Sequence, residues 1–235
     1  MIDTILFDLD GTLLPMDQEA FLKAYLGLLA DKMAQYGYEP KRLVKSVWAG
    51  TEAMVRNNGL MTNEAVFWRC FRQIHGDKAM EDQPIFEEFY AVDFPKVQTS
   101  CGFAPAAKEA VQTLKEKGYR LVLATNPLFP AIATRQRIRW AGLKEEDFVL
   151  VTTYENSRHC KPNPDYYRDV LAAVGAKPEN CMMVGNDVDE DMIAGRLGME
   201  VYLVTDCLIN RQEKDLTGYR KGKLEDFAAF VKEQL

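Results

Sequence analysis

The sequence predicts an α/β protein with a doubly wound parallel sheet that is interrupted by an all-helical insertion. Five short apolar runs, each ended by turn or polar residues, alternate with segments of helical periodicity. Such alternation is typical of a parallel sheet that is covered by helices. Between the first run and the second, however, the apolar positions recur only at three-and-four spacing, which indicates helices without strands.

The composition limits the classes of partner. The 235-residue chain is 47% hydrophobic, which allows one large domain or two smaller ones with a sizeable core. Its net charge of −6 offers no basic excess for nucleic acid or an anionic membrane surface. No apolar run approaches the roughly 20 residues of a membrane span. We therefore expect a small-molecule partner, and neither nucleic acid nor a membrane.

Cysteine usage and the N-terminus favour a cytoplasmic protein. The five cysteines are scattered, and none forms a Cys-x-x-Cys pair. We interpret them as reduced residues rather than as a disulfide framework or a zinc site. The N-terminus enters the first predicted strand directly, without the basic and apolar segments of a signal peptide.

The first predicted strand leads into the stretch from Asp8 to Thr12, which contains two acids and a glycine. Residues i and i+2 of an extended chain point the same way, so Asp8 and Asp10 should emerge together at the carboxyl end of the strand. Ligands bind at that edge in open α/β sheets. Two carboxylates so close repel each other unless a cation lies between them or one takes a proton. The pair therefore suits a magnesium site, and equally a nucleophile beside a general acid.

The insertion should contain four helices. Helical periodicity covers residues 17–35, 40–57, 63–75 and 83–92. Gly37 and Pro40 end the first helix, Gly59 suits a left-handed terminus after the second, and Thr62 is a plausible N-cap of the third. Without a strand to continue the sheet, we expect a separate small bundle. We interpret its aromatic residues, Trp48 and Trp68 included, as core.

The remaining chain returns to alternation. Strands are expected at 119–124, 148–152, 181–184 and 200–204, and helices at 105–117, 128–141, 164–174, 189–197 and 223–234. Polar side chains follow these strands, as they follow the first. They are Thr125 and Asn126 after the second strand, Lys161 in the loop after the third, and Asn186, Asp187 and Asp191 after the fourth. In a parallel sheet these ends share one edge, and this set has the parts of a phosphoryl-transfer site.

On these residues the chain resembles the haloacid dehalogenase-like hydrolase superfamily. Its four motifs are matched in order by Asp8-Leu9-Asp10-Gly11-Thr12, by Thr125, by Lys161, and by the acidic stretch from Gly185 to Asp191. The helical insertion matches the family's cap in its first insertion position. The resemblance implies a Rossmann-like catalytic core of residues 1–15 and 99–235, with a four-helix cap domain of residues 16–98.

The resemblance also implies an activity: Mg²⁺-dependent hydrolysis of a small-molecule phosphate monoester through an aspartyl-phosphate. Asp8 would be the nucleophile, and Asp10 would protonate the leaving alcohol and then activate water. Thr125, Asn126 and Lys161 would bind the phosphoryl group. The implied metal residues are Asp8, Asp10, Asp187 and Asp191, with Asp10 binding through its backbone carbonyl and Asp191 ligating through water or orienting the site.

The fourth motif departs from the family's commonest pattern. Many members have Gly-Asp where this chain has Gly185-Asn186. We favour Asp187 as the metal ligand because it is charged and magnesium prefers carboxylate oxygen, while the carbonyl of Asn186 stays an alternative.

Five further charged residues nearby are expected to be solvated. We interpret Asp189 and Glu190 as a helix start favoured by the helix dipole. Arg135, Arg137 and Arg139 do not share one helical face, and we expect them in solvent.

Other activities of the superfamily remain alternatives. Asp10 argues against a dehalogenase, because those members lack this second acid. A phosphonatase would need a cap lysine, and none lies in an identifiable context. A phosphomutase stays open, as does a phosphate-ligand-binding or regulatory protein without catalysis. The chain is expected to be a monomer or a homodimer.

Overall fold

The computed structural model describes all residues 1–235, and its centre is a six-stranded parallel sheet. The strand order is β3-β2-β1-β4-β5-β6, which places β1 in the middle and confirms the predicted α/β class. The strands are β1 (Thr4–Phe7), β2 (Arg120–Leu123), β3 (Leu150–Val151), β4 (Cys181–Gly185), β5 (Glu200–Val204) and β6 (Arg220–Gly222). The order of the strands reverses beside β1, where ligands bind in doubly wound sheets.

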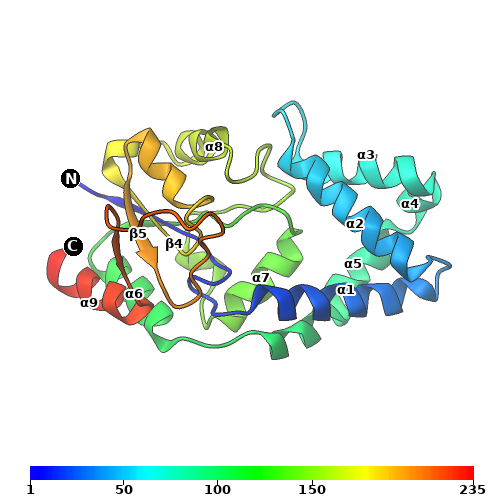
Figure 1. Ribbon diagram of the computed structural model, residues 1–235, viewed down its shortest axis with the longest axis horizontal. Helices are drawn as coiled ribbons and strands as arrows, with labels where there is room; N and C mark the ends of the chain where they lie inside the picture. The colour runs from blue at the N-terminus through cyan, green and yellow to red at the C-terminus, as the bar shows by residue number, and fades with distance from the viewer.

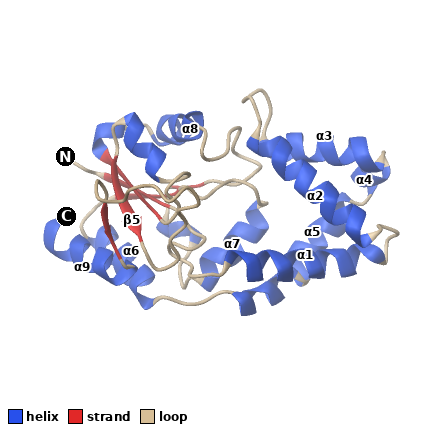
Figure 2. Ribbon diagram, in the orientation of Figure 1, coloured by secondary structure: helices blue, strands red, loops and turns tan.

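Helices cover both faces of the sheet, with α8 on one side and α6 and α9 on the other (Figure 2). The helices of this part are α6 (Pro105–Glu116), α7 (Ala131–Trp140), α8 (Pro164–Val174) and α9 (Leu224–Gln234), with the short 3-10 helices η2 (Glu145–Asp147), η3 (Pro178–Asn180) and η4 (Met192–Leu197). The helix expected over 189–197 forms only in part: a turn occupies 189–191, and the 3-10 helix η4 follows it. None of the helices in the structure combines the length and the apolar character needed to cross a membrane.

Alternation along β1 explains why this strand is buried on both sides. Ile5 and Phe7 point into the larger core with α6 and α9, whereas Leu6 points into a second core with α8. Side chains alternate across a strand, so a strand that is covered on both faces needs an unbroken apolar run. That run ends at Asp8, where the carboxyl edge of the sheet begins.

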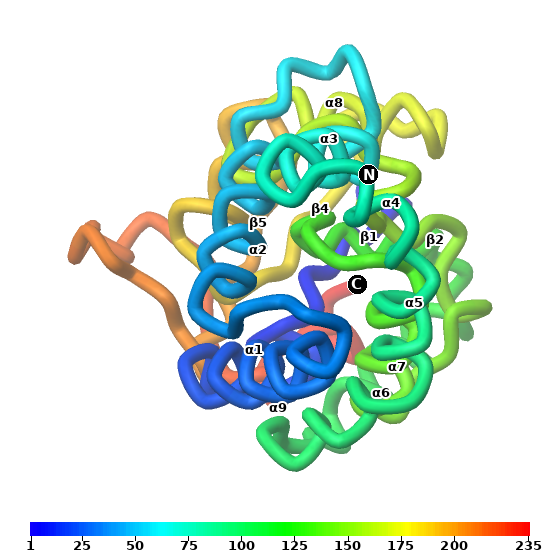
Figure 3. The backbone as a smooth tube through the Cα atoms, turned by 90° about the vertical axis from the view of Figure 1, so that its right-hand side faces the viewer, coloured from blue at the N-terminus to red at the C-terminus, as the bar shows by residue number.

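The insertion after β1 is helical, as predicted, and lies beside the sheet rather than extending it (Figures 1 and 3). It contains α1 (Gln18–Ala34), α2 (Pro40–Val55), α3 (Asn63–His75), a short α4 (Lys78–Glu81), α5 (Gln83–Val92) and the 3-10 helix η1 (Phe94–Ser100). Thr62 caps α3 by accepting a hydrogen bond of 3.2 Å from the backbone N–H of Ala65, which confirms the predicted N-cap. Gly59 has the expected left-handed conformation, with φ of +84°.

Aromatic residues join the insertion to the rest of the protein. Phe21 and Tyr25 of α1 pack against Phe94, and all three rings also contact Phe129 at ring-centroid distances of 5.3 to 6.1 Å. Phe129 precedes α7 and belongs to the part of the chain that forms the sheet. The two parts therefore share one apolar core.

A buried polar contact fastens α3 to two loops of the sheet. The Asn63 amide Nδ2 donates to the carbonyl oxygens of Pro127 and His159, both at 3.3 Å. Its backbone N–H donates to the carbonyl of Ser157 at 2.8 Å. Because Asn63 is fully buried, these hydrogen bonds are shielded from water. They connect α3 to the segments that carry the second and third motifs.

Candidate active site

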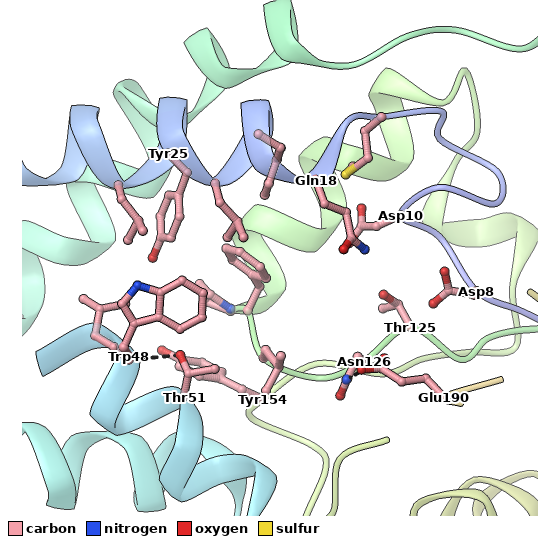
Figure 4. A pocket seen from close by; sticks show the side chains of 18 of the residues that line it. Asp8, Asp10, Gln18, Tyr25, Trp48, Thr51, Thr125, Asn126, Tyr154 and Glu190 are labelled. Carbon is pink, nitrogen blue, oxygen red and sulfur yellow. Dashed lines mark hydrogen bonds between the residues drawn. The ribbon is translucent and has the colours of Figure 1, made fainter. Parts of the chain in front are cut away.

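The turn after β1 brings two carboxylates to one cavity. The backbone N–H of Asp8 donates to the carbonyl of Val184 at 2.9 Å, which continues the pairing of β1 with β4. Gly11 then turns the chain with φ of +85°, and a Cβ there would overlap the amide of Asn186. A glycine is therefore required at this position. Asp8 and Asp10 both line the cavity, together with Thr125 (Figure 4).

Lys161 is a buried cation that pairs with two carboxylates of the site. Its Nζ donates to Asp8 Oδ1 at 2.9 Å and to Asp191 Oδ1 at 2.7 Å, and the residue is 1% exposed. Burial alone would lower the pKa of this ammonium, but the two carboxylates outweigh it and hold the pKa well above its usual value. Its position is set by the start of α8, where Asn163 is the N-cap and Pro164 fills the first turn.

The second motif is held in place by its backbone, and its side chains face the cavity. The carbonyl of Thr125 accepts hydrogen bonds from the hydroxyls of Thr152 and Tyr166, at 2.7 and 2.9 Å. The Thr125 hydroxyl is therefore presented by a fixed main chain. Asn126 lines the same cavity, and its Nδ2 donates to Glu190 Oε2 at 2.9 Å.

In the fourth motif, Asn186 is engaged at both ends of its amide. Its Oδ1 accepts from the Thr12 hydroxyl at 2.9 Å, and its Nδ2 donates to the carbonyl of Cys207 at 2.6 Å. This side chain ties the first motif to the loop after β5. It acts as a structural bridge at the floor of the site.

The carboxylate of Asp187 faces backbone donors on one side and a single guanidinium on the other. Its Oδ1 accepts from the N–H groups of Asp189 and Glu190, at 2.8 and 3.0 Å. Its Oδ2 accepts from Arg211 at 2.8 Å, and that arginine side chain is 58% exposed. A cation can compete for Oδ2 by displacing a largely exposed side chain.

Asp191 also lines the cavity, and its carboxylate is linked to the third motif and to the backbone of the fourth. One carboxylate oxygen accepts from Lys161, and the other accepts from the backbone N–H of Asp187 at 2.9 Å. A Cβ on Gly185 would overlap this carboxylate, so the glycine makes the room for it. Burial raises the pKa of Asp191 to about 7, although Lys161 opposes the shift.

Glu190 corrects one sequence-based expectation. We expected it to be solvated with Asp189, but it lines the cavity and accepts the hydrogen bond from Asn126. Burial raises the pKa of its carboxyl to about 7. The expected helix start does not form there, so Glu190 turns inward instead of lying on an outer helical face. Asp189 does remain at the surface side, where it pairs with Lys214.

Arg137 corrects a second expectation. Arg135 and Arg139 are exposed, as predicted, but Arg137 is 1% exposed and forms an ion pair with Asp10. Its guanidinium also lies 4.5 Å from the ring centroid of Phe129, within cation–π range. Arg137 is thus a buried cation beside the second acid of the first motif.

The environment of Asp10 suits proton transfer. Burial raises the pKa of its carboxyl to about 6, while Arg137 lowers it and Asp8 raises it. One oxygen pairs with Arg137, and the other, Oδ1, has no hydrogen-bond partner in the structure. This carboxyl can therefore carry a proton near neutral pH on an oxygen that no other group occupies.

The cavity extends from these acids into the helical insertion and has a volume of about 320 Å³. Trp48 was predicted to be core, but its side chain lines this cavity and 48% of the residue is exposed. Trp68 lines the cavity as well, although it is buried as expected. Every predicted site residue except Lys161 also lines the cavity, and Lys161 contacts it through Asp8.

The chain belongs to the haloacid dehalogenase-like hydrolase family, whose model matches residues 2–198. It is 29% identical over 203 residues to pyrophosphatase PpaX of Bacillus cereus (strain AH820), a match that covers 83% of this chain and 79% of the relative. It is also 28% identical over 209 residues to pyrophosphatase PpaX of Anoxybacillus flavithermus, with the same coverage.

Solved structures share the fold at low sequence identity. A predicted phosphoglycolate phosphatase from Haemophilus somnus 129PT has a TM-score of 0.61 at 17% identity, covering 98% of both chains. A 2-haloacid dehalogenase from Pseudomonas syringae pv. tomato DC3000 has a TM-score of 0.63 at 19% identity, covering 99% of both. Phosphatases and dehalogenases thus resemble this chain equally in fold, and the reaction must be argued from the site.

Proposed function

We propose that this hydrolase is a Mg²⁺-dependent phosphatase that cleaves a small-molecule phosphate monoester through an aspartyl-phosphate. One observation carries the proposal: the Asp8 carboxylate is held by a buried lysine, in a cavity that also contains a second, protonatable acid. A nucleophilic carboxylate needs a fixed orientation and charge neutralisation, and Lys161 supplies both.

In the first step an oxygen of Asp8 attacks phosphorus, and the bond between phosphorus and the leaving oxygen breaks. The Asp10 carboxyl gives its proton to the leaving alcohol. Its raised pKa of about 6 supports this role, since general acids work best with a pKa near the working pH. The Thr125 hydroxyl, the Asn126 amide and the Lys161 ammonium are the proposed donors to the phosphoryl oxygens.

In the second step water attacks the phosphorus of the aspartyl-phosphate. The Asp10 carboxylate formed in the first step takes a proton from that water. The bond to Asp8 breaks, phosphate leaves, and both carboxylates return to their starting states. Arg137 keeps the Asp10 side chain in place through both proton transfers.

The donor set of the cavity fits a divalent cation. Five carboxylates line it, and three cationic side chains pair with them, so an excess of negative charge remains when all are ionised. We propose that Asp8, Asp187 and the Asp10 carbonyl hold Mg²⁺, with Asp191 behind them. When bound, the ion would neutralise charge on the transferring phosphoryl group.

The alternatives are supported less well. Asp10 has no task in dehalogenation, because a halide leaves without a proton. No lysine lines the cavity, so no candidate for the Schiff base of a phosphonatase is at hand. The protonatable Asp10 also argues for turnover rather than for binding alone. A phosphomutase would use the same groups and differs only in the fate of the phosphoryl group.

The decisive experiment measures phosphate release from acetyl phosphate and p-nitrophenyl phosphate with Mg²⁺. Asp8→Asn should abolish release from both. Asp3→Asn is the matched control, because Asp3 precedes β1 at its opposite end and is exposed. Release that persists in Asp8→Asn would exclude this nucleophile. Absence of turnover by the wild-type protein would favour a binding or regulatory role.

We propose different roles for the two parts of the chain. Residues 1–15 and 99–235 would form the catalytic core, and residues 16–98 the cap that contacts the leaving group. The unpaired state of the five cysteines is consistent with the proposed cytoplasmic location.

A further inference from the structure

We infer that the leaving group of the substrate is an uncharged, mainly apolar alcohol. This inference rests on the proposed function and adds the substrate class to it. The cavity has two ends (Figure 4). Asp8, Asp10 and Thr125 lie at one end, and Tyr25, Trp48 and Thr51 lie at the other, so a bound phosphate would direct its alcohol toward the helical insertion.

The insertion end of the cavity has no charged side chain. Of the 28 residues that line the whole cavity, 16 are hydrophobic. The lining residues contributed by α1, α2, α3 and α5 are polar at Gln18 and Thr51 and otherwise aliphatic or aromatic. The single cationic lining residue is Arg211, and it already pairs with Asp187 at the phosphoryl end.

Three hydroxyls that line the insertion end, those of Tyr25, Tyr90 and Thr51, are already satisfied by the protein. Tyr25 and Tyr90 hydrogen-bond to each other at 2.8 Å, and the Thr51 hydroxyl donates to the carbonyl of Val47 at 2.9 Å. Burial raises the pKa of Tyr25 to about 12, so this hydroxyl stays neutral. One buried donor of this region, the Nε1–H of Trp68, has no acceptor. Apart from this one donor, the polar groups of Tyr25, Tyr90 and Thr51 need no partner from a ligand.

This lining discriminates between leaving groups by charge. Pyrophosphate and phosphoglycolate each present a second anionic group. On binding, that group would lose its contact with water and face an apolar wall that has no cation to pair with it. Burying an unpaired charge is strongly unfavourable, whereas burying an alkyl or aryl group is favourable. The volume of about 320 Å³ lies at the small end of the range of ligand pockets, roughly 300 to 1,000 Å³. It suits a short branched or a single-ring alcohol.

The test compares substrates that differ only in the leaving group. Ethyl, butyl and hexyl phosphate share one reacting centre, so a gain along this series reports contact with the apolar wall. We expect kcat/KM to rise about fourfold per buried methylene until the cavity is filled. Pyrophosphate and phosphoglycolate should be slower than hexyl phosphate. A flat series, or a preference for either substrate with a second anionic group, would overturn the inference while leaving the phosphatase proposal intact.

A substituted wall provides the second arm. Thr51→Arg places a cation at the insertion end and should shift the preference between hexyl phosphate and phosphoglycolate by roughly tenfold or more toward the latter. Thr113→Arg is the matched control, because the Thr113 hydroxyl likewise donates to the carbonyl four residues earlier, at 2.9 Å, on a helix that is not part of the cavity. An unchanged preference in Thr51→Arg would contradict the inferred direction of the alcohol.

A binding measurement keeps the two proposals separable. Trp48 and Trp68 line the cavity, so their fluorescence should respond when hexyl phosphate binds to the Asp8→Asn protein. Saturation at lower concentration with hexyl phosphate than with pyrophosphate supports the inference, and the reverse order overturns it. If no ester is hydrolysed, the phosphatase proposal fails, and this titration still decides the preference of the cavity.

Discussion

Arg137→Met should destabilise the protein far more than the replacement of an exposed arginine would. Arg137 is 1% exposed and is paired with Asp10, and methionine keeps most of the apolar packing while removing the charge. Breaking a buried ion pair typically costs about 3 to 5 kcal/mol. We expect the lower end, about 3 kcal/mol, because the Asp10 side chain is 23% exposed and can take a proton. For a chain of this size the Tm should fall by about 6 to 12 °C.

Thermal unfolding at pH 7.5 measures this loss, with Arg135→Met as the control on the same helix. Arg135 pairs with Glu145 at 2.7 Å, but both side chains are about half exposed, so the control should lose no more than about 1 kcal/mol. Adding Asp10→Asn to Arg137→Met should recover part of the stability, because no buried charge is then left unpaired. Equal losses in the two single variants, or no recovery in the double variant, would refute the reasoning.

The same substitution should shift the pH dependence of catalysis. The guanidinium lowers the pKa of Asp10, so its removal lets that pKa rise. A general acid works below its pKa, and the alkaline limb of kcat/KM for an alkyl phosphate should therefore move to higher pH in Arg137→Met. p-Nitrophenyl phosphate needs less proton donation and should respond less. A pH profile identical to that of the wild type would show that Arg137 acts on stability alone.

Three further outcomes follow from the buried carboxylates and the close glycine. The folded-state pKa of Glu190 is raised from 4.5 to about 7, so the stability linked to its protonation is lost as the pH rises through 7. With EDTA present, the free energy of unfolding of Glu190→Gln should therefore exceed that of the wild type by up to about 3 kcal/mol at pH 8 and equal it near pH 4. Thermal scans at the two pH values measure this difference. Asp191 has a pKa of about 7, so protons should compete with Mg²⁺ below that pH. Calorimetry should find that Mg²⁺ binds more tightly as the pH rises from 6, with a plateau above pH 8. A Mg²⁺ affinity independent of pH would contradict this. Gly185→Ala should cost about 1 to 3 kcal/mol through overlap with Asp191, whereas the exposed helical control Gly27→Ala should be neutral or stabilising by up to about 1 kcal/mol, as denaturant unfolding would report.

The sheet could be predicted because its strands are buried on both faces. Such strands are continuous apolar runs, and β1, β4 and β5 stand out in the sequence for that reason. The edge strand β6, Arg220–Gly222, was missed because Arg220 and Lys221 are charged and exposed and Gly222 has no side chain. An edge strand without an apolar side chain has no apolar pattern to recognise.

Arg137 was missed although its sequence position holds a signal. Arg135 and Arg139 lie four residues apart and share one helical face, so Arg137 lies on the opposite one. Ala133 and Ala141, four residues before and after it, are both fully buried. A charged residue in the middle of an apolar face needs a buried partner, and Asp10 is that partner. Arg211, by contrast, comes from a loop whose sequence offers no such pattern.

If substrate enters by a movement of the insertion away from the sheet, the Asn63 contact would link that entry to the integrity of the phosphate site. Moving the insertion away from the sheet must break its hydrogen bonds to the loops that carry Asn126 and Lys161. An opening motion would thus loosen the groups proposed to bind phosphate, and closure would restore them. Release of product would then be aided by the same displacement that admits the next molecule. Rates of turnover would depend on a side chain that contacts neither the phosphate nor the metal.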